Sequence, residues 1–200
     1  MSERKTKHDL RSAATRERLL TAARRLFAER GYAAVGTEEI VQAAGVTRGA
    51  LYHQFRDKAD LFAGVAELVE AEVNERIAEG VRSGGAADPL EALRAGARMF
   101  LEFCAEPDLE RILLLDAPAV LGSVAWRELG SRYGLGQVKA ILRAAMDAGA
   151  IAVQPVDPLA HLLLGALDEA ALYIAHADAP ATARKECVAA LDRMIRGLRD

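Results

Sequence analysis

The chain has 200 residues, and its 26 Lys and Arg against 29 Asp and Glu leave a formal net charge of −3. Hydrophobic residues make up 52% and charged residues 28%, which allows a sizeable core and excludes an intrinsically disordered chain. The basic residues gather early: residues 1–62 carry a net charge of +4 and residues 63–200 a net charge of −7. A basic head on an acidic body is typical of a nucleic-acid contact confined to one end, although segments of this length also differ by several charges through chance.

Composition also predicts the compartment. Uninterrupted apolar runs fall short of the roughly 20 residues that cross a bilayer, and no apolar stretch follows Met1 to Lys5 as in a secretory signal. Two cysteines, Cys104 and Cys187, are too few for a disulfide framework or a metal site. We therefore expect a cytoplasmic protein with free thiols, no cofactor and no membrane contact.

Four helices are expected in the first 88 residues, which contain no proline. Apolar side chains at three- and four-residue spacing predict a helix that ends at Gly31. Thr37 and Thr47 are placed to cap two short helices, about 38–44 and 48–55. A longer fourth helix, about 57–80, has an apolar stripe of Leu61, Val65, Leu68, Val73 and Ile77.

Capping and breaking signals predict five more helices after residue 88. Asp88 and Asp157 each precede a proline, which is a typical helix start. Glycines 130, 134 and 136 are expected to loosen the helix over 123–149. Nine helices and no strand make the predicted fold all-α. The five helices cover 88–104, 109–115, 123–149, 157–175 and 181–198.

Residues 37–55 have the parts of a helix-turn-helix motif. The first short helix ends in two alanines, whose small size lets the helices cross closely, and Gly45 permits a tight turn. Val46 fills the angle, and Leu51 and Phe55 face inward. The second short helix would enter the major groove of DNA, where its N-terminal residues reach base edges.

Residues 15–62 resemble the DNA-binding domain of TetR/AcrR-type transcriptional regulators. The run AGVTRGALY over 44–52, closed by Phe55 and Lys58, carries the resemblance. It implies a three-helix head over 15–62 after a flexible basic arm (1–14), and a helical effector-binding and dimerisation body over 63–200. The implied function is a sequence-specific DNA-binding regulator, a repressor that a small molecule releases.

The resemblance also implies which residues meet DNA. Thr37, Tyr52 and Lys58 would bind backbone phosphates, and the start of the second short helix would read bases, with Arg48 suited to guanine. The implied set is Thr37, Thr47, Arg48, Gly49, Ala50, Tyr52, His53 and Lys58. Helix capping, packing and solvated surface charge remain open for the threonines, Tyr52 and Arg48 respectively.

The resemblance gives no firm role to two parts of the head. The family often has histidine where this chain has Gln54, which cannot become cationic, and His53 stands one position earlier, where it is expected near the groove. The basic residues Arg4, Lys5 and Lys7 form either a disordered tail or an arm in the minor groove.

The body is expected to hold a largely apolar small-molecule effector, since few charges lie in its apolar segments. Asp116 and His161 stand out because each interrupts an apolar run, although core packing remains the alternative for every candidate. The pocket candidates are Met99, Phe100, Phe103, Leu113, Asp116, Trp126, Tyr133, Met146, His161 and Tyr173.

The last two helices are expected to form a homodimer by packing against their copies in a four-helix bundle. Twofold symmetry then predicts a palindromic operator whose half-sites lie about 34–36 Å apart or somewhat more. The expected interface residues are Gly165, Ala166, Val188, Leu191, Ile195 and Leu198.

Three other functions remain open at this point. An enzyme is disfavoured because Cys104, Cys187, Asp116, His161 and Asp168 form no nucleophile, phosphate-loop or metal motif. A thiol-based redox sensor would need a cysteine in an electropositive setting, which neither cysteine has. A DNA-binding regulator without an effector would share every residue of the head.

Overall fold

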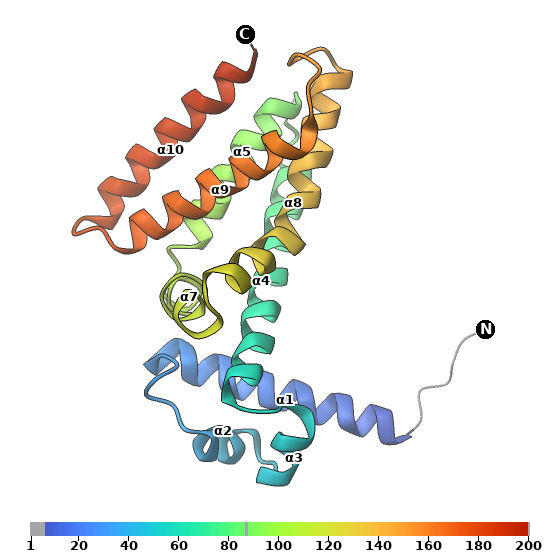
Figure 1. Ribbon diagram of the computed structural model, residues 1–200, viewed down its shortest axis with the longest axis vertical. Coiled ribbons are helices and arrows are strands. Elements are labelled where there is room, and N and C mark those ends of the chain that lie inside the picture. The colour runs from blue at the N-terminus through green and yellow to red at the C-terminus, as the bar shows by residue number, and fades with distance from the viewer. Residues whose placement is uncertain (1–6, 87, 200) are drawn as a thin grey trace.

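The computed structural model describes residues 7–86 and 88–199, which form helices and no strand. One end of the molecule is a small head of three helices, and the other is a larger helical body (Figure 1). A single long helix joins them. The head contains α1 (Lys7–Arg30), α2 (Thr37–Ala44) and α3 (Arg48–Gln54), and α4 (Lys58–Ser83) runs from the head into the body.

The body confirms the all-α prediction. Its helices are α5 (Pro89–Phe103), α6 (Pro107–Leu109), the π-helix η1 (Glu110–Asp116), α7 (Ala117–Leu121), α8 (Ser123–Asp147), α9 (Val156–Ala175), α10 (Pro180–Arg196) and the short 3-10 helix η2 (Gly197–Arg199). Counting the continuous stretch from α6 to α7 as one helix and η2 as the end of α10, the described residues form the nine helices expected from sequence.

An aromatic cluster holds the head together. The rings of Phe27, Tyr32 and Phe62 lie 5.2 to 5.7 Å apart between centroids, two of the three pairs edge-on. Leu19 and Leu51 are fully buried beside them. Because Phe62 belongs to α4 and packs in this cluster, a boundary between head and body at residue 62 falls inside a continuous helix.

Polar contacts fix the end of α1 to the body. Tyr32 donates its backbone N–H to Asp116 Oδ2 at 2.7 Å, and Arg24 pairs with Glu72 on α4 and with Asp108 on α6. Gly31 has a φ of +78°, and a Cβ there would lie 3.1 Å from Arg111 Nη1. Asp116, expected in the effector pocket, instead joins the head to η1.

The beginning of the chain differs from the expected flexible arm. Helix α1 begins at Lys7, so residues 7–14 are helical rather than an extended arm. Arg4 and Lys5 lie outside the described residues. Helix formation here follows from Ala13 and Ala14 and from the absence of proline or glycine before residue 31.

Two expectations about helix faces are corrected. Of the stripe expected on α4, Leu61, Val65 and Val73 are buried and Ile77 packs against the core, but Leu68 is 42% exposed. The inward face also carries Phe62, Ala66, Val69 and Glu70. Helix α8 runs unbroken through its three glycines. A Cβ at Gly134 would lie 3.3 Å from Leu164 Cδ1, so this glycine serves close packing of α8 against α9 rather than looseness.

Helix α9 is long and apolar enough, by length and composition, to cross a membrane. Asp157, Asp168 and Glu169 interrupt its apolar run, so the sequence contains no continuous apolar segment of that length. The helix packs against α5, α8 and α10 and buries six of its residues. This packing is that of a core helix in a helical body.

Candidate DNA-binding surface and body cavity

Gly45 makes the turn between α2 and α3 possible. Its φ is +60°, its N–H donates to Gln42 O, and the next N–H, of Val46, donates to Val41 O. Arg18 of α1 donates to Gly45 O at 2.9 Å, and its Nη2 would lie only 2.7 Å from a Cβ at this site. The positive φ therefore favours glycine here, and any side chain would also require the end of Arg18 to move.

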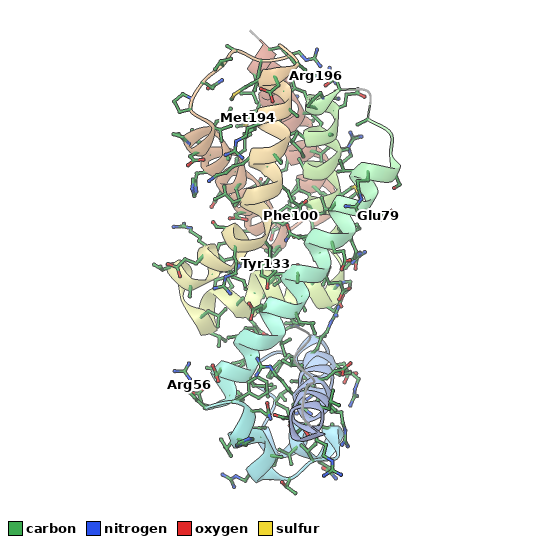
Figure 2. All side chains as sticks on the ribbon, turned by 90° about the vertical axis from the view of Figure 1, so that its right-hand side faces the viewer. Arg56, Glu79, Phe100, Tyr133, Met194 and Arg196 are labelled. Atoms are coloured by element: carbon green, nitrogen blue, oxygen red, sulfur yellow. The ribbon has the colours of Figure 1, made fainter. Side chains whose placement is uncertain are left out.

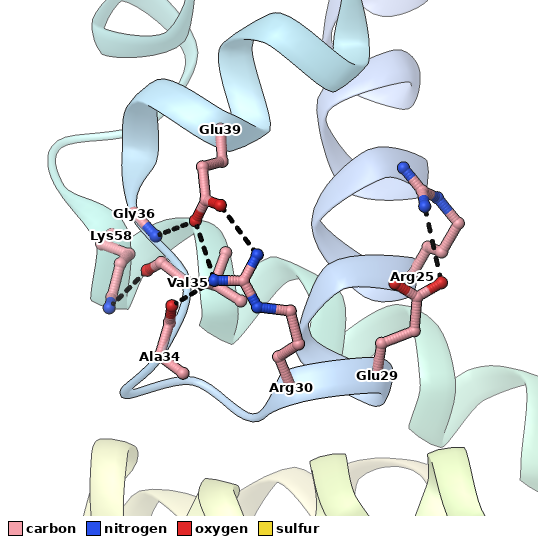
Figure 3. A network of polar contacts seen from close by, with 8 residues as sticks. All are labelled: Arg25, Glu29, Arg30, Ala34, Val35, Gly36, Glu39 and Lys58. Atoms are coloured by element: carbon pink, nitrogen blue, oxygen red, sulfur yellow. Dashed lines mark hydrogen bonds and ion pairs between the residues drawn. The ribbon is translucent and has the colours of Figure 1, made fainter.

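A polar network sets the start of α2, and it corrects the expected cap. Gly36, not Thr37, is the N-cap, and its N–H donates to Glu39 Oε2 at 3.0 Å (Figure 3). Arg30 pairs with Glu39 at 2.7 Å and donates to Ala34 O at 2.8 Å. The Arg30 guanidinium and the Gly36 N–H together lower the pKa of Glu39. Thr37 is thus the first helical residue, and its side chain is half-buried.

Helix α3 presents the expected base-reading residues to solvent. Thr47 caps it as predicted, with Oγ1 accepting from Ala50 N at 3.2 Å. Leu51 is fully buried, whereas Thr47, Gly49 and His53 are exposed and Ala50 is half-buried. One face of this short helix is therefore anchored on α1 and the other is open.

Arg48 has one exposed ionic partner. Its side chain is 66% exposed, and Nη1 lies 3.0 Å from Glu38 Oε1 on α2. The guanidinium lies 5.6 Å from the ring centre of Tyr52, which is itself 44% exposed. An ion pair this exposed contributes little stability, so Arg48 remains available to another anion or to a base edge.

The Lys58 side chain is held by contacts within the protein, whereas the resemblance implied a contact with a DNA phosphate. Its ammonium donates to Val35 O at 2.9 Å (Figure 3). It also donates to Tyr32 O at 2.8 Å and lies 4.0 Å from the Tyr32 ring centre. Gln54 turns toward α1, where Nε2 donates to Ser12 Oγ at 2.7 Å. Lys58 thus fastens the loop before α2 to the start of α4, and Gln54 lies off the open face of α3.

The body contains a cavity of about 450 Å³ between α4, α5, α8 and α9. Phe100, in the middle of the body, belongs to its wall (Figure 2). Most of the wall is aliphatic, and three glycines leave room. The lining residues include Ile77, Val81, Leu93, Gly96, Phe100, Gly130, Gly134, Gln137, Val138, Ile141, Leu164 and Leu167.

Of the ten expected pocket residues, Phe100 alone lines this cavity. Tyr173 is 58% exposed, Leu113 is buried in η1, and the phenol of Tyr133 donates to Glu67 Oε1 at 3.2 Å. Spacing along one helix did not show which neighbour each side chain would meet. Besides Asp116, five expected residues lie elsewhere. Met99 lies against Gly80, Phe103 lies under the Arg76 guanidinium, and Met146 is half-buried near the end of α8. Trp126 and His161 line another pocket, of about 270 Å³.

The polar groups of the cavity are Glu70, Asn74, Gln137, Asp168 and, at its edge, Arg82, and none of them is among the residues expected to line it. Burial raises the pKa of Glu70 to about 7, against a smaller opposite effect of Asn74, whose Nδ2 donates to Glu70 Oε1 at 2.9 Å. Burial also raises the pKa of Asp168 to about 6. The signal for Glu70 was present: it stands four residues after Ala66 and three before Val73, which is the spacing of the inward face of α4.

The expected dimer contacts on α10 are corrected. Leu191 and Ile195 are 5% and 2% exposed, and both pack with Val188 against α5 within the same chain. Leu198 is half-buried against the core. Gly165 is exposed and Ala166 half-buried on α9. The outward face of the two last helices instead carries Leu162, Tyr173 and Met194, which are 72%, 58% and 55% exposed.

The two cysteines lie in settings that suppress thiolate formation. Cys104 is buried, and this burial raises its pKa well above the ordinary value, with Glu70 and Asp168 adding to the shift. Burial also raises the pKa of Cys187. Reactive cysteines have lowered pKa values, so neither environment favours a redox sensor.

This geometry defines a helix-turn-helix protein: two short helices cross at a glycine turn, and the second exposes its N-terminal residues at one end of an all-helical molecule. Residues 19–65 match the family described as "Bacterial regulatory proteins, tetR family", and residues 90–198 match "Tetracyclin repressor-like, C-terminal domain". The second match alone covers more than half of the chain. The chain belongs to the TetR family. This confirms the predicted resemblance of the head, and it places the chain among transcriptional regulators rather than enzymes.

Individual relatives agree. A TetR-family transcriptional regulator from Pectobacterium atrosepticum is 37% identical, with a TM-score of 0.84 over 96% of this chain and 97% of the other. The regulator AcrR of Shigella flexneri is 39% identical over 111 residues, 56% of this chain and 50% of AcrR. TtgR of Pseudomonas putida is 35% identical over 46% of this chain and 42% of TtgR. The chain spans about half the length of these two curated relatives.

One solved structure shares the fold at lower identity. RolR in complex with the ligand resorcinol is 23% identical, with a TM-score of 0.75 over 96% of this chain and 95% of the other.

Proposed function

We propose that the protein is a cytoplasmic homodimeric repressor that binds a palindromic DNA operator and is released by a small molecule bound in the body cavity. The observation that carries the proposal is the open N-terminal face of α3, where Thr47, Arg48 and Gly49 are exposed on a helix anchored by the buried Leu51. A short helix held in this way fits the major groove, and its leading residues reach base edges.

The DNA contacts divide by chemistry. Arg48 is the base reader, because an exposed guanidinium can bond bidentately to guanine once it leaves Glu38. Thr47, Gly49, Ala50 and His53 line the same face, and Ala50 suits a thymine methyl group. Thr37, Tyr52 and Lys58 are assigned to backbone phosphates. Lys58 adds a positive charge at the start of α4 while it holds the loop before α2.

The homodimer would form through the outward face of α9 and α10. Leu162, Tyr173 and Met194 are large apolar side chains exposed on this face, next to Gly165 and Ala166, which permit close approach. Burying such a patch against its copy is favourable, and an isologous contact gives the twofold symmetry that a palindrome requires.

Helix α4 offers the connection between effector and DNA. Its first residue, Lys58, fastens the head, and residues 70–82 of the same helix line the cavity. A ligand that favours one position of α4 would change the separation of the two heads and so the affinity for the operator. RolR, a protein of the same fold, was solved with a small molecule, which supports an effector role for this architecture.

The test is selection of binding sites from a random duplex pool with the purified protein, repeated with metabolite extract. A palindromic consensus whose recovery falls in extract supports the proposal. A consensus that no extract fraction affects supports the second candidate, a DNA-binding regulator without an effector, which the cavity disfavours. Failure to enrich any sequence at low ionic strength contradicts both.

A further inference from the structure

The polar groups of the body cavity are almost all hydrogen-bond acceptors. Glu70 and Asp168 bring carboxylates, and the Nδ2 group of Asn74 is occupied by Glu70 O and Oε1, both at 2.9 Å. Gln137 donates one of its two Nε2 hydrogens to Asn74 O at 3.3 Å, and its carbonyl oxygen is a further acceptor. A ligand that supplies donors would satisfy these groups, whereas a ligand with only acceptors would leave them unpaired.

Within the described residues, no cation acts on Glu70, and Arg127, whose charge lowers the pKa of Asp168, lies beyond ion-pair distance of that carboxylate. No Lys, Arg or His in that part of the chain lies within 4.0 Å of the carboxylate oxygens of Glu70 or Asp168. Glu70 is only 8% exposed, and it lies near enough to Asp168 for the two charges to raise its pKa further. An ionised carboxylate in such a place is costly until a cation joins it.

Arg82, a cation at the edge of the cavity, does not pair with Glu70 or Asp168. Arg82 lines the cavity, but its side chain is 65% exposed and pairs with Glu79 on the outer face of α4. It lies three helical turns from Glu70 along α4, so it marks the rim and not the acidic end. An anionic ligand attracted by Arg82 would have to place its apolar part against the two carboxylates.

A metal ion is also a poor match. The described residues contain no group of three or more His, Cys, Asp or Glu side chains able to hold one. Hard cations require six or more oxygen ligands, and most of this wall is aliphatic. The volume of about 450 Å³ lies within the range of small-molecule sites.

We propose that this cavity binds an organic cation, an amine or quaternary ammonium compound whose charge lies between Glu70 and Asp168 and whose apolar part contacts Phe100, Leu164 and Leu167. This inference deepens the proposed function, since it names the class of effector, and it rests on the cavity being the effector site. The apolar wall selects for the body of the ligand and the carboxylates select for its charge.

The experiment uses three probes with the same aromatic body and isothermal titration of the purified full chain without DNA. The probes are 1-naphthylmethylamine, which is a cation at pH 7.5, its neutral N-acetyl derivative, and the anion 1-naphthylacetate. We expect the amine to bind at least about tenfold more tightly than the neutral compound, because a charge-assisted hydrogen bond contributes that much or more. The anion should bind most weakly.

Matched variants locate the charge. Glu70→Gln and Asp168→Asn should each weaken amine binding about tenfold and leave the neutral compound within about twofold. Glu75→Gln removes an exposed carboxylate from the same helix and should change neither. Circular dichroism checks that each variant is folded, and the amide variants keep the shape of the side chains they replace.

The outcomes separate this inference from the proposed function. No amine binding, equal binding of the amine and the neutral compound, or a preference that survives in both variants overturns the organic-cation site. Operator release is then measured with the same probes. If the amine binds through Glu70 and Asp168 but leaves the operator complex intact, the ligand class stands and its role as effector is wrong. If only neutral compounds release DNA, the effector role stands and the organic cation is wrong.

Discussion

The head and the body use charged side chains in opposite ways. In the head, the side chains of Arg48 and Arg56 are 66% and 85% exposed, and each is paired with a carboxylate at the surface. Arg56 lies at the head end of the molecule (Figure 2). In the body, Glu70 and Asp168 are withdrawn from solvent, and burial raises both pKa values. Under the proposed function, the head carries charge to DNA outside it, and the body keeps charge for a small effector.

The two regions also differ in how far their geometry is forced. The turn at Gly45 has a left-handed conformation, and its carbonyl oxygen accepts a hydrogen bond from Arg18. The body contains a π-helical segment, η1, and a cavity between four helices. Irregular segments of this kind often occur at functional sites, and α4 is shared by the head and the body.

The largest expected effect on operator affinity comes from a substitution on the outward face of α9. Leu162→Arg should break the homodimer while each chain stays folded, and operator affinity should fall by about 100-fold or more because the second half-site no longer assists the first. Sedimentation velocity and duplex binding measure this. Leu68→Arg, at an exposed leucine on α4, is the control and should stay dimeric.

Ile195→Arg should act differently, since Ile195 is 2% exposed within one chain. It should destabilise the chain itself by roughly 3–5 kcal/mol, as expected for an unpaired buried charge. If this variant were a well-folded monomer, Ile195 would belong to the dimer interface and not to the core of one chain.

The next effect is a pH dependence of stability that belongs to Glu70. Its folded pKa of about 7 lies above the ordinary value of 4.5, so between these pH values the folded state holds more protons than the unfolded state. Stability therefore falls as pH rises through this range. Glu70→Gln should match the parent near pH 4 and exceed it by up to about 3 kcal/mol at pH 8. Urea denaturation at the two pH values measures it, and an equal gain at both would show that burial of the charge is not the cause.

Arg48→Ala should weaken operator binding by roughly 1–3 kcal/mol per half-site and relax the preference for one base pair. Site selection with the variant measures the base preference. Glu38→Gln is the informative partner, because it removes the carboxylate that holds Arg48 and should keep the preference. Unchanged selectivity in Arg48→Ala would move base reading to another residue of α3.

Lys58→Met should weaken binding to all sequences alike and reduce the slope of log affinity against log salt by about 0.9. The variant should also loosen the loop before α2, since Tyr32 O and Val35 O lose their shared donor. Salt titrations of duplex binding measure the slope, with Arg82→Met, far from the head, as control. A changed base preference would mean that Lys58 reads sequence.

The smallest effect concerns two glycines of α8. Gly130 and Gly136 each have open space where a Cβ would be, and Gly130 lines the cavity. Replacing either with alanine should stabilise the chain by about 0.5–1 kcal/mol through helix propensity. Gly130→Leu should in addition block binding of 1-naphthylmethylamine, while Gly136→Leu should not. Equal ligand binding in the two leucine variants would place the ligand elsewhere.

The sequence by itself determined the helices, the glycine turn and the exposed face of α3, because local signals specify them: Thr47 caps its own helix and Gly45 ends the one before. Tertiary structure decided everything that depends on which helices meet. Periodicity marked Leu191 and Ile195 as apolar but not the helix they would face, and it marked Asp116 but not its contact with Tyr32. The cavity arises from residues of four helices, and Glu70 and Asp168, 98 residues apart in the chain, meet only when α4 and α9 pack around the same space.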